Sequence, residues 1–270
     1  MSIQVSRTHL LSTLKKLYPV SLAESWDNVG LLVDTPIPDT TPLKILLTID
    51  LTSSVANEAL TGGFNFIVAY HPFIFSGIKK ISPRSNPQHD SLVKLITGGV
   101  SVYSPHTVID SIKGGVNDWL VEGLVSSDMN QVKSSKVINE VEEGVGCGRL
   151  VTLKESVKVS DLIPRIKSHL QVDNLLVSNG SLPKQVTTIA VCAGSGASVF
   201  KGVDADLYYT GELSHHEILF LKEQGKAVIC ANHSNTERGY LKRVKEDLER
   251  QGFSGVVEIS QTDKDPLQFV

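Results

Sequence analysis

The sequence predicts an α/β protein in which mixed sheets are flanked by helices. Near-continuous apolar runs such as "LKILLTID" (43–50) and "FNFIVAYHP" (64–72) are typical of strands that are buried on both faces of a parallel sheet. Segments of helical character that end in glycine, such as "SSVANEALTGG" (53–63), lie between these runs. Because the two kinds of segment alternate along the first half of the chain, we expect helices to connect parallel strands.

The first half of the chain opens with a helix. Residues 1–20 place Leu10, Leu11, Leu14 and Leu17 on one helical face. The segment "SWDNVGLLVD" (25–34) comes next, ahead of the three segments described above. The elements that follow those three are the helix "SLVKLITGG" (91–99), the strand "VSVYSPH" (100–106) and the helix "GVNDWLVEGL" (115–124).

A change of composition after residue 124 indicates a second unit. Residues 125–148 are polar and irregular, which predicts a linker or a crossing into that unit. The elements expected beyond it are the helix "DLIPRIKSHL" (161–170), the strands "VTTIAVCAGSG" (186–196) and "ADLYYTGEL" (205–213), the helix "HHEILFLKEQG" (215–225), the strand "KAVICANH" (226–233) and the helix "TERGYLKRVKEDLERQG" (236–252).

Composition and charge exclude several classes of protein. The net charge of −3 and the pI of about 6.2 leave no electrostatic footprint for nucleic acid. No apolar stretch approaches the roughly 20 residues that a membrane helix needs. Cys147, Cys192 and Cys230 are far apart and form no C-x-x-C motif, which indicates a reducing compartment and no structural zinc site. We expect a cytoplasmic protein, with mitochondria as the alternative because the N-terminal segment is basic and amphipathic.

Three histidines share one context, because each follows a predicted buried strand. His71 follows "FNFIVAY", His106 follows "VSVYSP" and His233 follows "AVICAN". In open α/β sheets ligands bind beyond the carboxyl ends of the strands, where loops converge on one edge. Histidine is also the commonest metal ligand among side chains. These three residues are therefore candidate metal ligands.

Two carboxylates accompany these histidines. Asp110 lies four residues after His106, and Glu237 lies four residues after His233. Five such groups exceed the three protein ligands typical of one catalytic zinc, and could hold two ions about 3.5–4 Å apart. Buried carboxylates that converge without a cation would each cost several kcal/mol. Placement alone leaves open the alternative of unrelated polar residues in three separate loops.

Several motifs, in order over nearly the whole chain, resemble one known family. They are "SWDNVGLLVD", "AYHPFIF", "SPHTVID", "GGVNDWL", "YYTGELSHHEIL" and "NHSNTERGYL", of which the last is the most specific. The chain resembles the Nif-three-like proteins, a family associated with dinuclear metal sites, in which some bacterial members are labelled GTP cyclohydrolase type 2. We expect a fungal member of this family.

The resemblance implies a Nif-three-like fold with a discontinuous outer domain. That domain would bind metal and comprise residues 1–125 and 226–270, with a smaller α/β domain inserted at residues 130–225. The resemblance also implies a homohexamer built as a trimer of dimers. The family's metal ligands correspond to His71, His106, Asp110, His233 and Glu237.

One residue departs from the pattern of many bacterial members, which carry two adjacent histidines where this chain has Tyr70-His71. A neutral phenol is a poor replacement for an imidazole ligand. We therefore expect one firm site for a divalent ion (zinc, iron or manganese) and a second site that is weak or empty.

Two functions follow as hypotheses. The first is a metal-dependent hydrolase of an unknown small molecule, with Glu237 and Asp110 as catalytic residues; only the family label suggests a nucleotide or phosphorylated substrate. The second is a non-catalytic metal-binding protein that interacts with a transcriptional adaptor, the association from which the family takes its name.

Three further features carry weaker signals. Asp27, in a turn beside Trp26, is a candidate for orienting a ligand histidine. Glu212 and the pair His215-His216 belong to the family motif without being expected ligands. The glycines of "CAGSGAS" (192–198) favour a tight turn after a strand over a phosphate-binding loop.

Overall fold

The computed structural model describes residues 6–36, 38–178, 185–253 and 257–267. The chain folds into two compact units. Unit 1 comprises Met1–Ile109 and Leu241–Lys264, and unit 2 comprises Asp110–Tyr240 and Asp265–Val270. The α/β class with two mixed sheets is confirmed.

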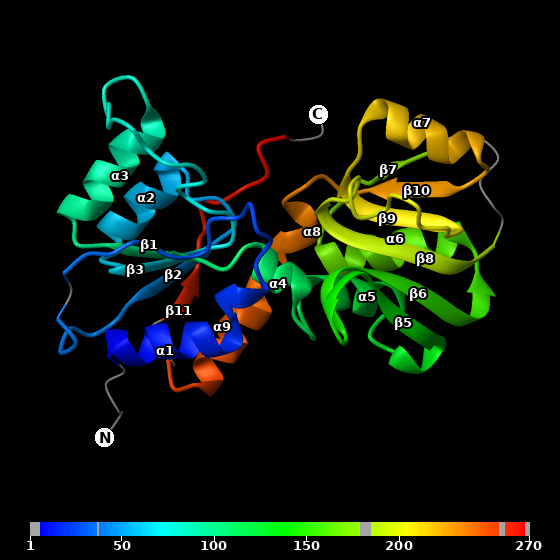
Figure 1. Ribbon diagram of the computed structural model, residues 1–270, viewed down its shortest axis with the longest axis horizontal. Coiled ribbons are helices and arrows are strands. Elements are labelled where there is room, and N and C mark those ends of the chain that lie inside the picture. The colour runs from blue at the N-terminus through cyan, green and yellow to red at the C-terminus, as the bar shows by residue number, and fades with distance from the viewer. Residues whose placement is uncertain (1–5, 37, 179–184, 254–256, 268–270) are drawn as a thin grey trace. The chain divides into compact units, whose positions relative to one another are not determined.

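Unit 1 is built on a five-stranded sheet with the order β1-β4-β3-β2-β11. Neighbouring strands are parallel except that β1 is antiparallel to β4. Figure 1 shows α2 and α3 on one face of this sheet and α1 and α9 on the other. The strands are β1 (Gly30–Val33), β2 (Ile45–Thr48), β3 (Phe66–Ala69), β4 (Ser101–Ser104) and β11 (Val257–Ile259). The helices are α1 (Arg7–Leu17), η1 (Val20–Leu22), α2 (Ser53–Thr61), α3 (Pro87–Thr97) and α9 (Leu241–Arg250).

The core of unit 1 follows from the apolar runs of the sequence. β2, β3 and β4 are buried at every position, as expected for strands covered on both faces. Leu46 and Ile67 pack with Val55 of α2 and Leu92 of α3 in one cluster. The amphipathic first helix is confirmed, with Leu10 and Leu14 fully buried; residues 1–5 lie outside the described part of the chain.

Unit 2 is built on a six-stranded sheet with the order β5-β6-β8-β9-β10-β7. β8, β9 and β10 are parallel neighbours, whereas the pairs β5–β6, β6–β8 and β10–β7 are antiparallel. The strands are β5 (Val132–Glu142), β6 (Val145–Val157), β7 (Leu176–Val177), β8 (Val186–Ser195), β9 (Leu207–Glu212) and β10 (Ala227–Cys230). The helices are α5 (Val116–Leu124), η2 (Met129–Gln131), α6 (Val159–Leu170), α7 (His215–Glu223) and α8 (Asn235–Arg238), and α4 (Thr107–Ser111) begins in unit 1 and ends in unit 2.

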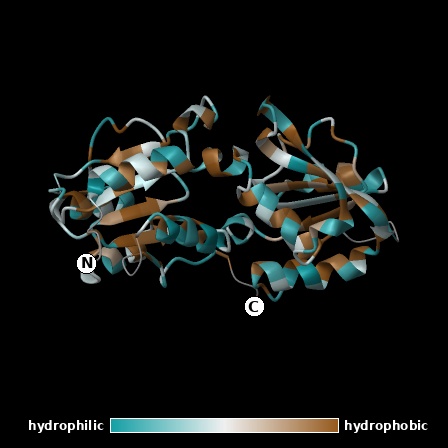
Figure 2. Cartoon of the chain, turned by 90° about the horizontal axis from the view of Figure 1, so that it is seen from below, coloured by the Kyte–Doolittle hydropathy of each residue, from teal (hydrophilic) through white to brown (hydrophobic). Residues whose placement is uncertain are grey.

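Figure 2 shows the strands of the unit 1 sheet as mainly hydrophobic, while the helices carry both hydrophobic and hydrophilic residues. This is the pattern expected for sheets covered by amphipathic helices. Within the described residues, no helix combines the length and the apolar character needed to cross a membrane.

The two units divide the chain at different points from those expected. The sequence placed the boundaries near residues 125–130 and 225–226, whereas the structure divides the chain at 109/110, 240/241 and 264/265. Helix α5 belongs to unit 2 because it packs on β6, β8 and α6. The domain division inferred from the sequence stays a prediction, and the five expected ligands are distributed over both units.

The prediction of an irregular linker at residues 125–148 was wrong. These residues contain β5 and the start of β6, which form a hairpin. Strand β5 is largely exposed and its charged residues lie on both faces, so it lacks the alternation of apolar and polar residues by which a half-buried strand is recognised. The prediction of one helix over residues 236–252 was also wrong, because Gly239-Tyr240 separates α8 from α9.

The acidic residue Glu58 ties α2 to the segment after β11. Its carboxylate accepts hydrogen bonds from Ser260 Oγ (2.6 Å), Thr262 Oγ1 (2.6 Å) and the backbone N–H of Gln261 (2.9 Å). Burial acts to raise the pKa of Glu58, but these hydrogen bonds outweigh it and hold the pKa below the ordinary value of 4.5. The carboxylate form is therefore favoured in the folded state.

A pH-dependent contribution to stability is expected from this contact. Because the folded-state pKa lies below the unfolded one, the stabilisation is fully present above pH 4.5 and is lost as the pH falls through the folded-state pKa. The variant Glu58→Gln should unfold at lower urea concentration than the wild type at neutral pH, and the difference should shrink in acid. The matched variant Glu258→Gln, at an exposed position of β11, should leave the acid dependence unchanged. A constant Glu58→Gln difference from neutral pH to pH 3 would contradict the assignment.

Candidate metal centre

The parallel strands of unit 1 place three polar residues at one edge of the sheet. Asp50, His71 and His106 each follow the last residue of β2, β3 and β4, respectively, by two positions. The backbone N–H of His71 donates to Ile49 O (3.1 Å), and that of His106 donates to Tyr70 O (3.1 Å). The backbone thus brings the two histidines together, with 5.3 Å between their ring centroids. This edge has the placement expected of a ligand site.

Both imidazoles are held through Nδ1 by a carboxylate. His71 Nδ1 lies 2.9 Å from Asp50 Oδ1, and His106 Nδ1 lies 2.8 Å from Asp27 Oδ1. Since a carboxylate accepts hydrogen bonds, each Nδ1 carries the proton, and in a neutral imidazole the lone pair is then on Nε2. A histidine that binds a metal through one nitrogen is commonly held this way at the other.

Asp27 is the most enclosed of these carboxylates, because its side chain has no exposed surface. It also accepts hydrogen bonds from Thr107 Oγ1 (2.6 Å) and Thr107 N (3.2 Å). Burial acts to raise the pKa of Asp27, but the hydrogen bonds from His106 and Thr107 outweigh it and lower the pKa. The carboxylate therefore stays ionised and fixes the ring of His106. The backbone of His106 is also constrained by its surroundings. Its φ of +34° is a left-handed conformation that a non-glycine residue adopts only when the tertiary structure holds it there.

Tyr70 contributes an aromatic wall to this edge. Its side chain is buried, and its ring lies edge-on to His71 (5.4 Å between centroids) and to His106 (6.2 Å). A buried phenol ring therefore occupies the position next to His71.

Unit 2 brings together His233 and Glu237. His233 lies beyond the carboxyl end of β10, and Glu237 lies in α8 with 3% exposure. His233 Nδ1 lies 2.8 Å from Glu212 Oε1 at the end of β9, and His233 Nε2 lies 3.3 Å from Glu237 Oε1. A third histidine is thus held through Nδ1 by a carboxylate, and its Nε2 faces a second one.

The pairing of His233 Nε2 with Glu237 Oε1 fits a cation. If Glu212 accepts the Nδ1 proton of a neutral imidazole, the lone pair of Nε2 faces a carboxylate oxygen at 3.3 Å, and two acceptors repel without a positive charge near them. Two ligand atoms that each lie about 2.1 Å from one ion in tetrahedral geometry are about 3.4 Å apart. The observed spacing is close to that value. The alternative is a doubly protonated His233 between two carboxylates.

Gly194 makes room for these two side chains. A Cβ at this position would lie 2.8 Å from Glu237 Oε1 and 2.9 Å from His233 Nε2. Its φ of +60° also belongs to the left-handed region that favours glycine. The backbone here is fixed, because Gly194 N donates to Thr236 Oγ1 (2.8 Å). Gly194, within β8, therefore allows the backbone to approach the ligand atoms closely.

Asp110 lies at the start of unit 2. Its backbone carbonyl accepts from Asn117 Nδ2 (2.9 Å), and Asn117 Oδ1 accepts from Ala193 N (2.9 Å) beside Gly194. The pKa of buried Cys192 is raised by its hydrogen bond with Cys147, by burial, and by the negative charges of both Asp110 and Glu237. The two predicted catalytic carboxylates therefore share the surroundings of one buried thiol.

The three His–carboxylate pairs contain six side chains. The sequence identified four of them, either as candidate ligands or as a candidate for orienting a ligand, and it missed one completely. The histidines were candidate ligands, and Asp27 was a candidate for orienting one of them. Glu212 was noted only as part of a family motif. Asp50 was missed, although it ends the run "LKILLTID" just as the histidines end theirs. Applying the strand-end criterion to carboxylates as well as imidazoles would have found it.

The role of Glu212 can be tested without disturbing the core, because its side chain is 56% exposed. Glu212→Gln should keep the fold and weaken zinc binding about 10- to 100-fold, since an amide holds the Nδ1–H of His233 less strongly than a carboxylate. Competition with a chromophoric chelator measures this affinity. The exposed variant Glu223→Gln on α7 is the control. Equal zinc affinities in the two variants would exclude the supporting role.

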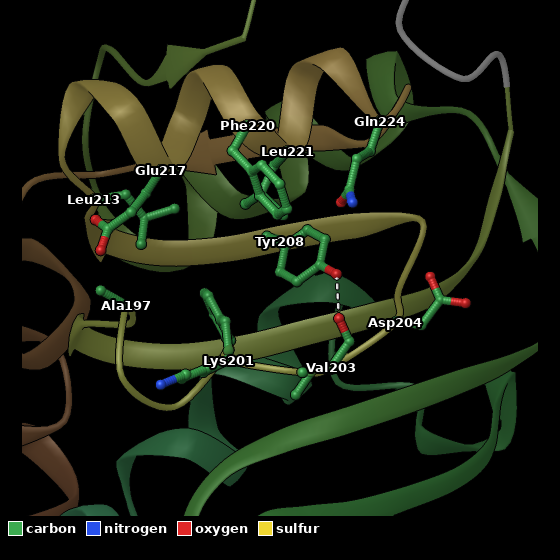
Figure 3. Close-up of a pocket in the computed structure, with 12 residues that line it drawn as sticks. Ala197, Lys201, Val203, Asp204, Tyr208, Leu213, Glu217, Phe220, Leu221 and Gln224 are labelled. Atoms are coloured by element: carbon green, nitrogen blue, oxygen red, sulfur yellow. Dashed lines mark hydrogen bonds between the residues drawn. The ribbon is translucent and has the colours of Figure 1, made fainter.

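A separate cavity of about 660 Å³ lies in unit 2 between α7, Tyr208 of β9 and the turn after β8 (Figure 3). Its lining is mainly apolar, with Phe220 and Leu221 on the helix. Two of its acidic side chains are engaged within the unit, because Glu217 caps α7 and Asp204 pairs with Lys226 (2.5 Å). The described residues that line it include no histidine or cysteine, so it is distinct from the candidate metal ligands.

Comparison with known proteins supplies the family. The model of the family described as Duf34/NIF3 (NGG1p interacting factor 3) matches residues 5–266. NGG1-interacting factor 3 of Saccharomyces cerevisiae is 44% identical, and the match covers 99% of each chain. Protein NIF3 homolog of Schizosaccharomyces pombe is 42% identical over 97% of this chain and 99% of the relative.

Solved structures agree with this assignment at the level of the fold. A Staphylococcus aureus hypothetical protein, SA1388, superposes with a TM-score of 0.79 at 25% identity, covering 98% of this chain and 99% of that one. Reduced HcgD from Methanocaldococcus jannaschii superposes with a TM-score of 0.77 at 26% identity, covering 96% and 98%. The family model spans nearly all of the sequence and the fungal relatives exceed 40% identity over almost their whole lengths, so the chain belongs to the Duf34/NIF3 family.

Proposed function

We propose that this protein binds divalent metal through His71, His106, Asp110, His233 and Glu237 and acts as a metal-dependent hydrolase of a small molecule. The observation that carries the proposal is the repeated carboxylate–imidazole pair. Asp50, Asp27 and Glu212 each hold the Nδ1 of one histidine, so Nε2 is the atom through which each ring would bind an ion.

The donor set agrees with such an ion. His71, His233 and Glu237 offer two imidazoles and a carboxylate, a set that could hold a metal ion. Imidazole with carboxylate suits zinc, iron or manganese better than calcium, which prefers oxygen ligands alone. Gly194 provides the space that the ligand atoms of His233 and Glu237 need. Because Tyr70 stands where many relatives carry a second histidine, we propose one firm site and a second, weaker one.

The chemistry proposed for this centre divides between the ion and the chain. A bound divalent ion would polarise the substrate and lower the pKa of a water molecule toward neutrality. Glu237 and Asp110 would accept the proton that hydrolysis releases, at their carboxylate oxygens. The burial of Glu237, which is 3% exposed, supports that role for this carboxylate, because bulk water has little access to it. Asp27, Asp50 and Glu212 would keep the three rings oriented throughout.

Titration of metal-free protein tests the binding half of the proposal. Zinc, manganese and ferrous iron are titrated separately by calorimetry, and the metal-loaded protein is assayed against phosphate monoesters, phosphodiesters, nucleotides and amides. We expect one tight site in the wild type and a second, weaker site at higher metal concentration. His71→Ala and His233→Ala should each abolish tight binding, whereas His9→Ala, at an exposed position of α1, should not. Wild-type affinity in all three variants would refute the proposed ligand set.

The variant Glu237→Gln separates the two halves. It retains an oxygen donor but removes a proton acceptor, so metal should still bind, about tenfold more weakly, while turnover falls by about 100-fold or more. A Glu237→Gln variant that turns over substrate as fast as the wild type would exclude Glu237 as the proton acceptor. Asp110→Asn is the parallel test of the second carboxylate.

A second candidate function is a metal-binding protein that acts through protein partners without catalysis. The name of the Saccharomyces cerevisiae relative reports interaction with NGG1, and the loss of a second imidazole at Tyr70 favours a centre with one ion. Metal-dependent capture of such a partner by a protein inactive against every substrate class above would support this function over hydrolysis. Assembly as a hexamer, a trimer of dimers, belongs to the same proposal and is measured by light scattering after size-exclusion chromatography.

A further inference from the structure

Two large aromatic side chains of unit 1 lie exposed beside the histidine pair. Trp26 is 58% exposed and Phe75 is 55% exposed. Their ring centroids are 6.0 Å apart with an interplanar angle of 46°, so they touch one another in the open. Single exposed apolar residues are ordinary, but two large rings that cluster on the surface indicate a binding surface.

The Trp26 ring also contacts a proposed metal ligand. It lies edge-on to His106, with 6.0 Å between ring centroids and an interplanar angle of 77°. A flat group stacked on Trp26 would therefore lie next to His106, and through it next to His71, whose ring is 5.3 Å away.

The backbone beneath the two aromatic rings is fixed from both sides. Asp27, next to Trp26, holds His106 and Thr107, and Asn28 Nδ2 donates to Ile74 O (2.6 Å), next to Phe75. The same interactions that orient His106 thus place Trp26, and the bond from Asn28 joins the two aromatic segments. An exposed aromatic pair on a fixed backbone is pre-organised, so a ligand that stacks on it loses little of its binding energy to ordering the protein.

We propose that Trp26 and Phe75 form a stacking platform for a planar aromatic or heteroaromatic ring of the substrate. The proposal rests on the proposed function, because the platform would present the rest of the substrate to a metal held by His106 and His71. Aromatic faces bind flat rings by stacking without hydrogen-bond readout, so the platform selects a planar ring and tolerates differences among such rings.

Two probes that differ only in a ring test the platform. Adenosine 5′-monophosphate and ribose 5-phosphate share the sugar and the phosphate, and only the first carries a planar ring. The intrinsic fluorescence of Trp26 reports stacking directly, and the variant Trp119→Phe removes the signal of the buried Trp119. Should Trp119→Phe fail to fold, the difference between the wild type and Trp26→Leu isolates the same signal. Both probes are titrated with and without zinc.

We expect the nucleotide to quench Trp26 saturably and ribose 5-phosphate to leave its emission unchanged. Trp26→Leu should weaken nucleotide binding about tenfold and spare ribose 5-phosphate binding. Phe220→Leu, which alters an exposed aromatic residue at the separate cavity of unit 2, should change neither. Zinc affinity of Trp26→Leu should equal that of the wild type, since Trp26 supplies no ligand atom.

Other outcomes would overturn the inference. Equal affinities for the two probes, or no effect of Trp26→Leu on nucleotide binding, would exclude a ring-binding platform. An emission of Trp26 that shifts on dilution of the protein alone would identify the pair as a contact between copies of the chain. If the protein binds zinc but binds the two probes equally well, this inference is refuted and the metal centre is not. If the nucleotide alone quenches Trp26 in a protein that binds no zinc, the proposed metal centre is refuted and the stacking platform is not.

Discussion

Replacing Gly194 by alanine is expected to abolish tight metal binding in a protein that remains folded. The new Cβ would lie 2.8 Å from Glu237 Oε1 and 2.9 Å from His233 Nε2, distances that real Cβ atoms essentially never show. The backbone cannot easily retreat, because Gly194 N bonds to Thr236 Oγ1 and Gly194 O accepts from Thr210 Oγ1 (3.0 Å). Glu237 and His233 must therefore move, and zinc affinity should fall about 100-fold or more, because both ligand atoms are displaced.

A second glycine provides the control for this substitution. Gly202 has a similar left-handed backbone (φ +80°), but a Cβ there would meet nothing within 4 Å. Gly202→Ala therefore carries the same backbone strain, about 1 kcal/mol, without the contact with the ligand atoms. Urea unfolding should show a loss of stability in both variants, larger in Gly194→Ala, and chelator competition should show a loss of zinc affinity in Gly194→Ala alone. Unchanged zinc affinity in Gly194→Ala would mean that His233 and Glu237 do not share an ion.

The sequence predicted the parts of the fold that depend on apolar burial. The buried strands β2, β3, β4, β8 and β10 all lie in apolar runs that need no partner to be recognised, because both faces are covered. Knowing where those strands end was enough to nominate His71, His106 and His233. The same knowledge could not reveal which carboxylate each imidazole would face, since Asp27 and His106 are 79 residues apart in the chain.

The parts that could not be predicted depend on long-range contacts. Strand β5 is an exposed edge strand whose pairing with β6 defines it, so its own residues read as a polar loop. Helix α8 ends at Arg238, and the next residue, Gly239, lies against Trp119, where a Cβ would be 2.5 Å from the ring. The helical pattern of charged and apolar residues continues through that glycine, so the sequence alone does not show that α8 and α9 are separate helices. In both cases a partner distant in sequence determines the local structure.

Arg149 is a further case, and it carries the largest expected effect on stability. It lies in β6 with 2% exposure, and its guanidinium makes a two-point pair with Asp118 of α5 (Nε to Oδ1, 2.6 Å; Nη2 to Oδ2, 3.0 Å). It also donates to the carbonyls of Gly146 (2.7 Å), Gly148 (2.9 Å) and Ile112 (3.3 Å). Arg149 thus donates to two carbonyls of its own strand through one nitrogen, Nη1. One buried cation thus joins the β5–β6 hairpin to the helix beside it.

Arg149→Met should lower the free energy of unfolding by about 3 kcal/mol, measured by urea denaturation. The methionine fills most of the volume but leaves the Asp118 carboxylate without its cation and takes one donor from each of three carbonyls, of which Ile112 O still accepts from Gly115 N. Removing one partner of a buried pair costs more than the pair contributes. The partial exposure of Asp118 keeps the loss at the lower end of the range for buried pairs. Arg250→Met, which breaks the exposed pair with Asp247 on α9, should cost less than about 1 kcal/mol. If the carbonyls dominate, adding Asp118→Asn to Arg149→Met will restore little stability, whereas recovery of most of the loss would show that the uncompensated carboxylate is the main cost.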